Sequence, residues 1–367
     1  MVTITAQDVP GSQSHWDALA AKARLQRRTG LVMIYGFLIA ASIPIITAYF
    51  WLITLSFSAR LDDINSEVLW PSIFILVPAL VAIWIWAMVA PTRTLAFTGW
   101  GIICLATLII YWWLLGDELH TNNYRFLFNR DFNAENTTIV AAKDRVGFSA
   151  TSFPSVWSAA LNSLFIAVLS TLIVTTVASL SAYYISRFQF PLRISMLRAL
   201  LVLHAFPSMT LIVPLFLVLW YIGLLDTLWG VMLVLVGFEL PFAIFIMKGF
   251  FDAVPWEIEM SAIVDGATRR QAFIRVVLPR VFHGLIAISV FTFIRGWEEY
   301  IFMFTFLIKN TNWTMSLYMF FVIEENSLGI DFGLVSAVAV FYVLPAFVLY
   351  AFAQKYLLQM SVGGVKG

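Results

Sequence analysis

Long runs of apolar residues alternate with short polar segments along the chain. A helix that crosses the bilayer core needs about 20 predominantly apolar residues. Each such run should be helical, because backbone groups in hydrocarbon must hydrogen-bond to one another. The pattern therefore predicts an all-α polytopic membrane protein with about eight transmembrane helices. The runs lie at about 31–57, 68–90, 95–116, 160–186, 199–225, 227–250, 284–308 and 332–354.

The composition supports lipid as the solvent of most of the chain. Of the 367 residues, 61% are hydrophobic and 12% are charged, whereas about a quarter of a soluble domain is charged. A net charge of +1 argues against a nucleic-acid partner. The single cysteine, Cys104, excludes a disulfide framework. Residues 1–30 are polar and lack the pattern of a signal peptide, so we expect a cytoplasmic tail.

The distribution of lysine and arginine predicts the orientation. Basic residues are retained on the cytoplasmic side of a membrane. With the N-terminus inside, fifteen basic residues fall in cytoplasmic segments and six in external ones. We therefore expect a multi-pass protein of the bacterial inner (plasma) membrane with both termini cytoplasmic.

One polar, charged stretch lies between two apolar runs on the predicted cytoplasmic side. Residues 255–279 read PWEIEMSAIVDGATRRQAFIRVVLP. The stretch resembles the coupling loop of ABC importer permeases, with the form EAA, three residues, Gly, nine residues, Ile, any residue, Leu-Pro. Here Gly266 is followed after nine residues by Val276, and Leu278 and Pro279 then match.

The first half of this loop departs from the family pattern. The EAA positions hold Met260, Ser261 and Ala262, so the family glutamate is missing, although Glu257 and Glu259 lie nearby. The resemblance implies that this glutamate pairs with a basic residue of an ATPase subunit. Two hypotheses follow. Either Glu259 substitutes from the adjacent position, or Met260 packs into a more apolar groove of the ATPase.

Charge order within the loop predicts two short helices. Acidic residues precede Gly266 and basic residues follow it, and the glycine permits a sharp change of direction between them. The alternative is a solvated amphipathic loop on the membrane surface. The residues that the resemblance implies for ATPase coupling are Glu257, Glu259, Met260, Ser261, Ala262, Asp265, Gly266, Arg269, Leu278 and Pro279.

The resemblance extends beyond the loop. Residues 162–191 read NSLFIAVLSTLIVTTVASLSAYYISRFQFP, and residues 344–367 read LPAFVLYAFAQKYLLQMSVGGVKG. Both are similar to segments of the carbohydrate (MalG-like, binding-protein-dependent) permeases. That family implies six core helices, so the additional helix pair is interpreted as an insertion.

The expected organisation follows from these boundaries. It comprises a cytoplasmic tail (1–30), a first core helix (31–57), an inserted helix pair (58–116), an external loop (117–158), the permease core (159–358) with its coupling loop (251–283), and a cytoplasmic tail (359–367).

Charged residues inside the predicted spans are candidates for the solute pathway. Arg295, Glu298 and Glu299 are spaced i, i+3 and i+4, so they can face one another on a helix. Glu239 lies in another span. A charge in mid-membrane normally turns toward partners or water. These residues therefore line or gate a pathway, or they form a self-neutralised pair that fixes helix packing. A stripe of small residues with a four-residue period favours close helix packing; it comprises Ser163, Ala167, Thr171, Thr175 and Ser179.

No phosphate-binding GxxxxGK[ST] sequence is present, so we expect a non-enzymatic chain that binds no cofactor. The resemblance implies ATP and Mg on two separate ABC ATPase subunits, a second homologous permease, an external solute-binding protein and membrane lipid as partners. The expected function is the permease subunit of an ATP-driven importer for a sugar, polyol or related solute. One alternative is an ion-coupled secondary transporter that uses Arg295, Glu298 and Glu299. Another is a membrane scaffold.

Overall fold

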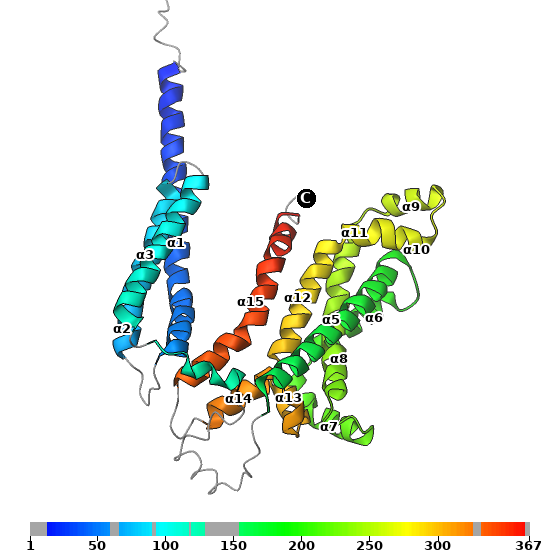
Figure 1. Ribbon diagram of the computed structural model, residues 1–367. Helices are drawn as coiled ribbons and strands as arrows, with labels where there is room; N and C mark the ends of the chain where they lie inside the picture. Colours follow the sequence, from blue (N-terminus) through cyan, green and yellow to red (C-terminus); the bar gives the residue numbers. More distant parts are fainter. Residues whose placement is uncertain are drawn as a thin grey trace, which may run out of the picture. The chain divides into compact units, whose positions relative to one another are not determined.

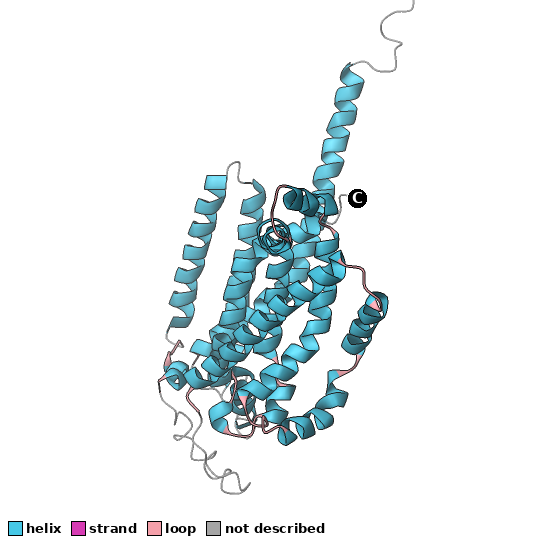
Figure 2. Ribbon diagram, turned by 90° about the vertical axis from the view of Figure 1, so that its right-hand side faces the viewer, coloured by secondary structure: helices cyan, strands magenta, loops and turns pink. Residues whose placement is uncertain are grey.

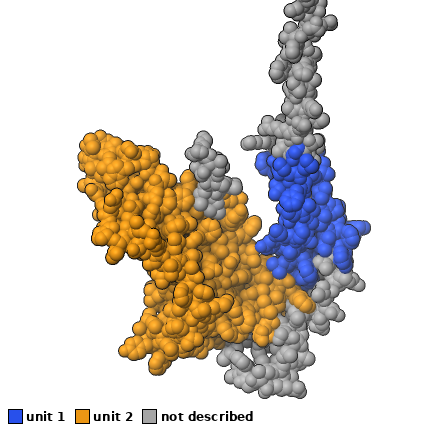
Figure 3. Space-filling model, turned by 180° about the vertical axis from the view of Figure 1, so that it is seen from behind, with its two compact units in different colours: residues 1–59, 64–120 blue, residues 60–63, 121–367 orange. Residues whose placement is uncertain are grey.

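The computed structural model describes residues 13–58, 66–89, 93–116, 119–128, 154–325 and 332–363. Within these ranges the chain consists of helices joined by loops and turns (Figure 2). They contain one isolated β-bridge, between Ser58 and Leu119. The chain divides into two compact units, coloured separately in Figure 3. Unit 1 comprises residues 1–59 and 64–120, and unit 2 comprises residues 60–63 and 121–367. The prediction of an all-α membrane protein is confirmed.

Unit 1 is built from three helices, α1 (Gln13–Phe57), α2 (Ser66–Val89) and α3 (Arg93–Leu115) (Figure 1). Helix α2 packs against both α1 and α3. The hydroxyl of Tyr111 on α3 donates to Oγ1 of Thr54 on α1 over 2.6 Å. Cys104 lies exposed on α3. Because α1 shares a unit with α2 and α3, its assignment to the permease core stays a prediction.

Unit 2 is organised around the long helix α5. Helix α5 (Val156–Arg187) packs against α8 (Leu228–Asp252) and α12 (Phe282–Glu298). Ser163, Ala167 and Ser179 of the predicted stripe are buried. Because their side chains are small, neighbouring helices can approach α5 closely. A Cβ on Gly296 of α12 would lie 2.9 Å from the Cα of Ala167. The other helices of unit 2 are α6 (Arg193–Ala205), α7 (Ile212–Tyr221), α9 (Trp256–Val264), α10 (Arg269–Ala272), α11 (Leu278–Arg280), α13 (Ile301–Phe306), α14 (Met315–Glu325) and α15 (Phe332–Gly363).

The expected count of eight spans is not confirmed. Among the described residues, five helices are long and apolar enough to cross a membrane, or up to seven if each of two bent pairs is one span. The run at 199–225 breaks between α6 and α7 with a bend of 88°, where Pro207 has an extended backbone. A proline cannot continue the helical hydrogen bonds of the preceding turn, which accounts for the break. The run at 284–308 divides at Glu299, between α12 and α13.

Much of the predicted external loop at 117–158 lies outside the described residues, as do residues 1–12 and 364–367. Its described part contains the 3₁₀ helix η2 (Asn122–Leu127), which packs against α15 and α5. The indole N–H of Trp157 at the start of α5 donates to the carbonyl oxygen of Leu127 over 2.9 Å.

Candidate functional site

The polar loop between α8 and α12 folds into a helical hairpin beyond the ends of these helices. Helix α9 leaves α8 through Pro255, and α10 returns on the other side of Gly266. The chain then continues through a π-helical turn (Phe273–Val277) and α11 to α12, which is bent by 74° from the segment Arg269–Arg280. Figure 1 shows α9 and α10 together at one end of unit 2. The predicted pair of short helices on either side of Gly266 is therefore present.

The first helix of the hairpin ends in a Schellman motif. The N–H of Ala267 donates to the carbonyl of Ala262, and the N–H of Gly266 donates to the carbonyl of Ile263, each over 3.0 Å. This motif needs a left-handed residue after the helix, and Gly266 has a φ of +93°. A Cβ at this position would meet no atom within 4 Å. The backbone conformation, rather than lack of space, therefore favours glycine.

A capping box starts the second helix of the hairpin. The backbone N–H of Gln271 donates to Oγ1 of Thr268 over 3.3 Å, and the N–H of Thr268 donates to Oε1 of Gln271 over 2.8 Å. These bonds satisfy backbone donors that the first helical turn leaves without partners. Local sequence signals thus define both sides of the turn.

Glu259 is buried beneath the hairpin rather than exposed on it. Only 2% of the surface of Glu259 is accessible to solvent. Oε2 lies 2.9 Å from Nε of Arg187 at the end of α5, and Oε1 accepts a hydrogen bond from the hydroxyl of Tyr183 over 2.5 Å. The hypothesis that Glu259 presents its carboxylate to a partner subunit therefore does not fit the structure.

The other residues predicted for coupling occupy different depths. Met260, Ala262 and Leu278 are half-buried. The exposed ones are Glu257, Ser261, Asp265, Gly266, Arg269 and Pro279. The structure adds Val264, which is 86% exposed at the end of α9. An apolar residue directly before the Asp-Gly turn was the available signal for it in the sequence.

The charged residues within the predicted spans do not pair as their spacing suggested. Nε of Arg295 lies 3.3 Å from Oε1 of Glu239 on α8. Glu298 is exposed, whereas Oε1 of Glu299 accepts the backbone N–H of Phe302 over 3.2 Å. Arg295 thus pairs with a residue of another helix, while Glu299, the C-cap of α12, bonds to the first turn of α13. A role of these residues in a solute pathway stays a prediction.

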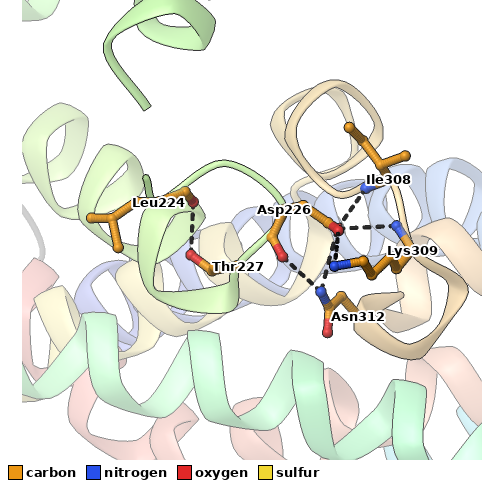
Figure 4. A network of polar contacts seen from close by, with 6 residues as sticks. All are labelled: Leu224, Asp226, Thr227, Ile308, Lys309 and Asn312. Atoms are coloured by element: carbon orange, nitrogen blue, oxygen red, sulfur yellow. Dashed lines mark hydrogen bonds and ion pairs between the residues drawn. The ribbon is translucent and has the colours of Figure 1, made fainter. Parts of the chain in front are cut away.

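At the opposite end of α8, Asp226 connects two segments that are distant in sequence (Figure 4). Its Oδ1 accepts the backbone N–H groups of Ile308 and Lys309 over 2.9 and 3.0 Å. Asn312 Nδ2 donates to the carbonyl oxygen of Asp226 over 2.7 Å, and Nζ of Lys309 lies 3.3 Å from Oδ2. Partial burial alone would raise the pKa of Asp226. The hydrogen bonds to its carboxylate outweigh burial, so the pKa lies below its ordinary value of 3.8.

An open hollow of about 680 Å³ adjoins this network. It is lined mainly by apolar side chains, including Leu161, Phe165 and Trp229. Among its polar lining residues, Asn312 donates to Asp226, Asn162 donates to the carbonyl oxygens of Thr311 and Trp313, and Thr227 donates to that of Leu224. These polar side chains therefore have hydrogen-bond partners within the chain, and the rest of the lining is apolar.

Comparison with known proteins identifies the family. The sequence profile described as "Binding-protein-dependent transport system inner membrane component" matches residues 174–359. The chain is 30% identical over 207 residues to the "Inner membrane ABC transporter permease protein YcjP" of Escherichia coli, covering 56% of this chain and 73% of that protein. It is 30% identical over 211 residues to the "Trehalose transport system permease protein SugB" of Mycobacterium tuberculosis, covering 57% and 77%.

A further relative is the "Diacetylchitobiose uptake system permease protein NgcG" of Streptomyces coelicolor, at 31% identity over 53% of this chain and 65% of that protein. Among solved structures, a chain of a bacterial ABC transporter involved in the import of the acidic polysaccharide alginate has a similar fold. The TM-score is 0.55 at 17% identity, over 92% of this chain and 98% of that chain. With its membrane-spanning helices and its matched profile, the chain belongs to the family of binding-protein-dependent transport system inner membrane components.

Proposed function

We propose that the chain is the permease subunit of an ATP-driven ABC importer for a sugar, polyol or related solute. The observation that carries this proposal is the helical hairpin around Gly266, which projects beyond the spans and exposes polar and apolar side chains. The names of the relatives SugB and NgcG refer to trehalose and diacetylchitobiose, which supports a carbohydrate as the solute class.

The exposed side of the hairpin is the proposed docking surface for an ATPase subunit. Val264 at its tip is 86% exposed and offers an apolar contact. Glu257, Asp265 and Arg269 offer charged contacts at its edges. Met260 replaces the family glutamate and is half-buried. An apolar groove in the ATPase suits this residue better than a basic side chain would.

The mechanism is alternating access driven from the cytoplasmic side. Two ATPase subunits, which bind ATP and Mg, close on nucleotide and displace the hairpins of this chain and of a second, homologous permease. The hairpin is continuous with α8 and α12, so its displacement changes the tilt of the attached spans. An external solute-binding protein delivers the solute on the opposite side. Both termini of this chain lie in the cytoplasm, and the chain itself binds no cofactor.

Reconstitution tests this proposal. The full complex, purified through this chain and reconstituted in proteoliposomes with the solute-binding protein, should take up radiolabelled trehalose or diacetylchitobiose when ATP is enclosed on the ATPase side. Uptake driven by a proton gradient without ATP would contradict the proposal and support the secondary transporter. Failure of any ATPase subunit to co-purify would contradict it equally.

A substitution at the hairpin tip tests the docking surface. Val264→Glu should reduce co-purification of the ATPase, because it places a charge at the apolar contact. The matched control is Thr311→Glu, which adds a charge at an exposed position on the predicted external side. Equal co-purification of the two variants would reject the hairpin as the docking surface.

A further inference from the structure

The guanidinium of Arg187 holds three positions of the hairpin to the end of α5. Its side chain is 6% exposed, and its Nε forms the ion pair with Glu259. One Nη donates to the carbonyl oxygen of Val254 over 2.9 Å. The guanidinium carbon also lies 5.6 Å from the ring centroid of Trp256, over its face. Arg187 thus binds the segment that leaves α8, the first residue of α9 and the middle of α9.

Each carboxylate oxygen of Glu259 is engaged by α5. Tyr183 lies one turn before Arg187, so both side chains are on the same face of that helix. Tyr183 contacts Oε1 and Arg187 contacts Oε2. A buried carboxylate that lost either partner would be left partly uncompensated. The contact is therefore an intrachain connection rather than a surface charge.

The second half of the hairpin also rests on this end of α5. The guanidinium of Arg269 lies 5.1 Å from the ring centroid of Phe188, the residue that follows α5. The rings of Tyr183 and Phe273 have their centroids 4.5 Å apart. Both halves of the hairpin therefore contact a helix that is not continuous with it.

The other end of α5 is bonded to the loop before α14. Nδ2 of Asn162 donates to the carbonyl oxygens of Thr311 and Trp313 over 3.0 and 2.9 Å. The backbone N–H of Met315 donates to Oγ of Ser163 over 2.7 Å. Helix α5 has 32 residues, which correspond to about 48 Å at 1.5 Å per residue. One unbroken helix thus connects the hairpin with the loop at 311–315.

We propose that the pair Arg187 and Glu259, here named the α5 latch, positions α9 on α5 so that displacement of the hairpin moves α5 and the loop at 311–315. Without the latch, the hairpin moves about its joints with α8 and α12, and α5 follows through side-chain packing and the exposed hydrogen bond from Ser186 to Asp252. Both are positioning residues, which act through α5 and not by contact with solute or nucleotide. This inference rests on the proposed function, because it requires an ATPase that displaces the hairpin.

The test measures how accessible residue 311 is, at the end of α5 opposite the hairpin. In the full complex in lipid nanodiscs, the background carries Cys104→Ser and Thr311→Cys. The measured quantity is the rate at which a maleimide fluorophore labels residue 311, with and without MgATP and vanadate. We expect trapping of nucleotide to change this rate in the background complex. Absence of any change there would contradict the proposed function itself.

The variant Glu259→Gln tests the latch independently of the proposed function. The variant removes the charge but keeps the shape, so the exposed docking residues are unaffected. We expect the nucleotide-dependent change in labelling to fall by about tenfold or more, since tenfold corresponds to less free energy than the loss of one partner of a buried ion pair, while ATP hydrolysis and co-purification persist. Deuterium uptake of residues 256–264 should rise at the same time. An unchanged labelling response in a background that responds would overturn the latch alone.

Two further variants complete the test. The matched control is Lys248→Gln, which breaks the more exposed ion pair with Asp252 near the same helix ends but keeps the hydrogen bond from Ser186 of α5 to Asp252; it should respond like the background. Arg187→Lys keeps the charge but cannot make the ion pair with Glu259 and the hydrogen bond to Val254 with one planar group, and it should give an intermediate response. If Glu259→Gln and Arg187→Lys both fail to yield a monodisperse complex, the pair is required for folding, and the proposed role in coupling is overturned.

Discussion

Nε of Arg295 on α12 lies 3.3 Å from Oε1 of Glu239 on α8, yet the two side chains differ sharply in exposure, at 63% for Arg295 and 15% for Glu239. Glu239 is thus held within the chain, whereas most of the guanidinium is open to the surroundings. A charge that faces hydrocarbon is costly. Arg295 should therefore face water or a neighbouring subunit in the assembled transporter.

Arg295→Gln is expected to affect transport more than stability. Because the guanidinium is largely exposed, the ion pair contributes only about 0–1 kcal/mol to the free energy of unfolding. The melting temperature of the purified chain should change little, while solute uptake or assembly with the proposed second permease should fall. The comparison variant is Glu239→Gln, which leaves Arg295 charged. A lower melting temperature with normal uptake would show that the pair only stabilises the fold.

Gly266→Ala is expected to disturb the hairpin through its backbone. The φ of +93° at this position is unfavourable for a residue with a Cβ, and such a conformation costs about 1–2 kcal/mol. The ATPase subunit should co-purify less well, and deuterium uptake of residues 265–272 should increase. Gly266→Asn should be milder, because asparagine tolerates the left-handed region better.

The control for this prediction is Gly249→Ala on α8. That glycine is helical, has no atom within 4 Å of an added Cβ and lies at an exposed position. Alanine should be tolerated there, since it has the higher helix propensity. If both variants behaved alike, the turn geometry at Gly266 would not be important for docking.

Gly296→Ala is expected to separate α5 from α12. The added Cβ would lie 2.9 Å from the Cα of Ala167 and 3.1 Å from Oγ of Ser170. The backbone of Ala167 cannot move away from the added Cβ as a flexible side chain could. We therefore expect a loss of about 1–3 kcal/mol in the free energy of unfolding. Thermal unfolding followed by size-exclusion chromatography measures it. Gly237→Ala on α8 has no such contact, and a similar loss in that variant would argue against overpacking.

The Asp226 network should make stability depend on pH in the acid range. The pKa of Asp226 in the folded chain lies below 3.8, so folding favours the ionised carboxylate. Its contribution is present above pH 3.8 and is lost as pH falls through the folded-state pKa. Asp226→Asn should therefore lower stability by about 1–3 kcal/mol near neutral pH, and the difference from the parent chain should shrink below pH 4.

Asparagine is the suitable replacement here because Asp226 has a φ of +59°, a conformation that asparagine tolerates. Melting temperatures of both chains between pH 3 and 7 provide the measurement. Lys309→Gln should have a smaller effect, since its ammonium side chain is 74% exposed. A constant difference across the whole pH range would mean that the charge of Asp226 is unimportant.

Features that depend on neighbours in sequence were predictable. The turn at Gly266 follows from one glycine between two short amphipathic segments, and the capping box from Thr268 and Gln271. The break after α6 also had a local signal in Pro207. The spacing around Gly266 and Pro279 gave the family, which the profile match confirms.

Features that depend on contacts between distant residues were not predictable in the same way. Glu259 reads as an exposed residue of a polar loop, and its burial follows from Tyr183, which is 76 positions away. Similarly, the spacing of Arg295 and Glu299 suits a helix, but α12 ends at Glu298 and the arginine pairs with Glu239 instead. The spacing of residues within one helix does not show which side chain of a neighbouring helix will be the partner.

The exposed thiol of Cys104 on α3 has a practical consequence for unit 1. Since the sequence holds one cysteine, a nitroxide or fluorescent probe attached to the unmodified protein reports from unit 1 alone. Spectra recorded during ATP turnover would then reveal whether α3 follows the transport cycle or stays still within the surrounding lipid.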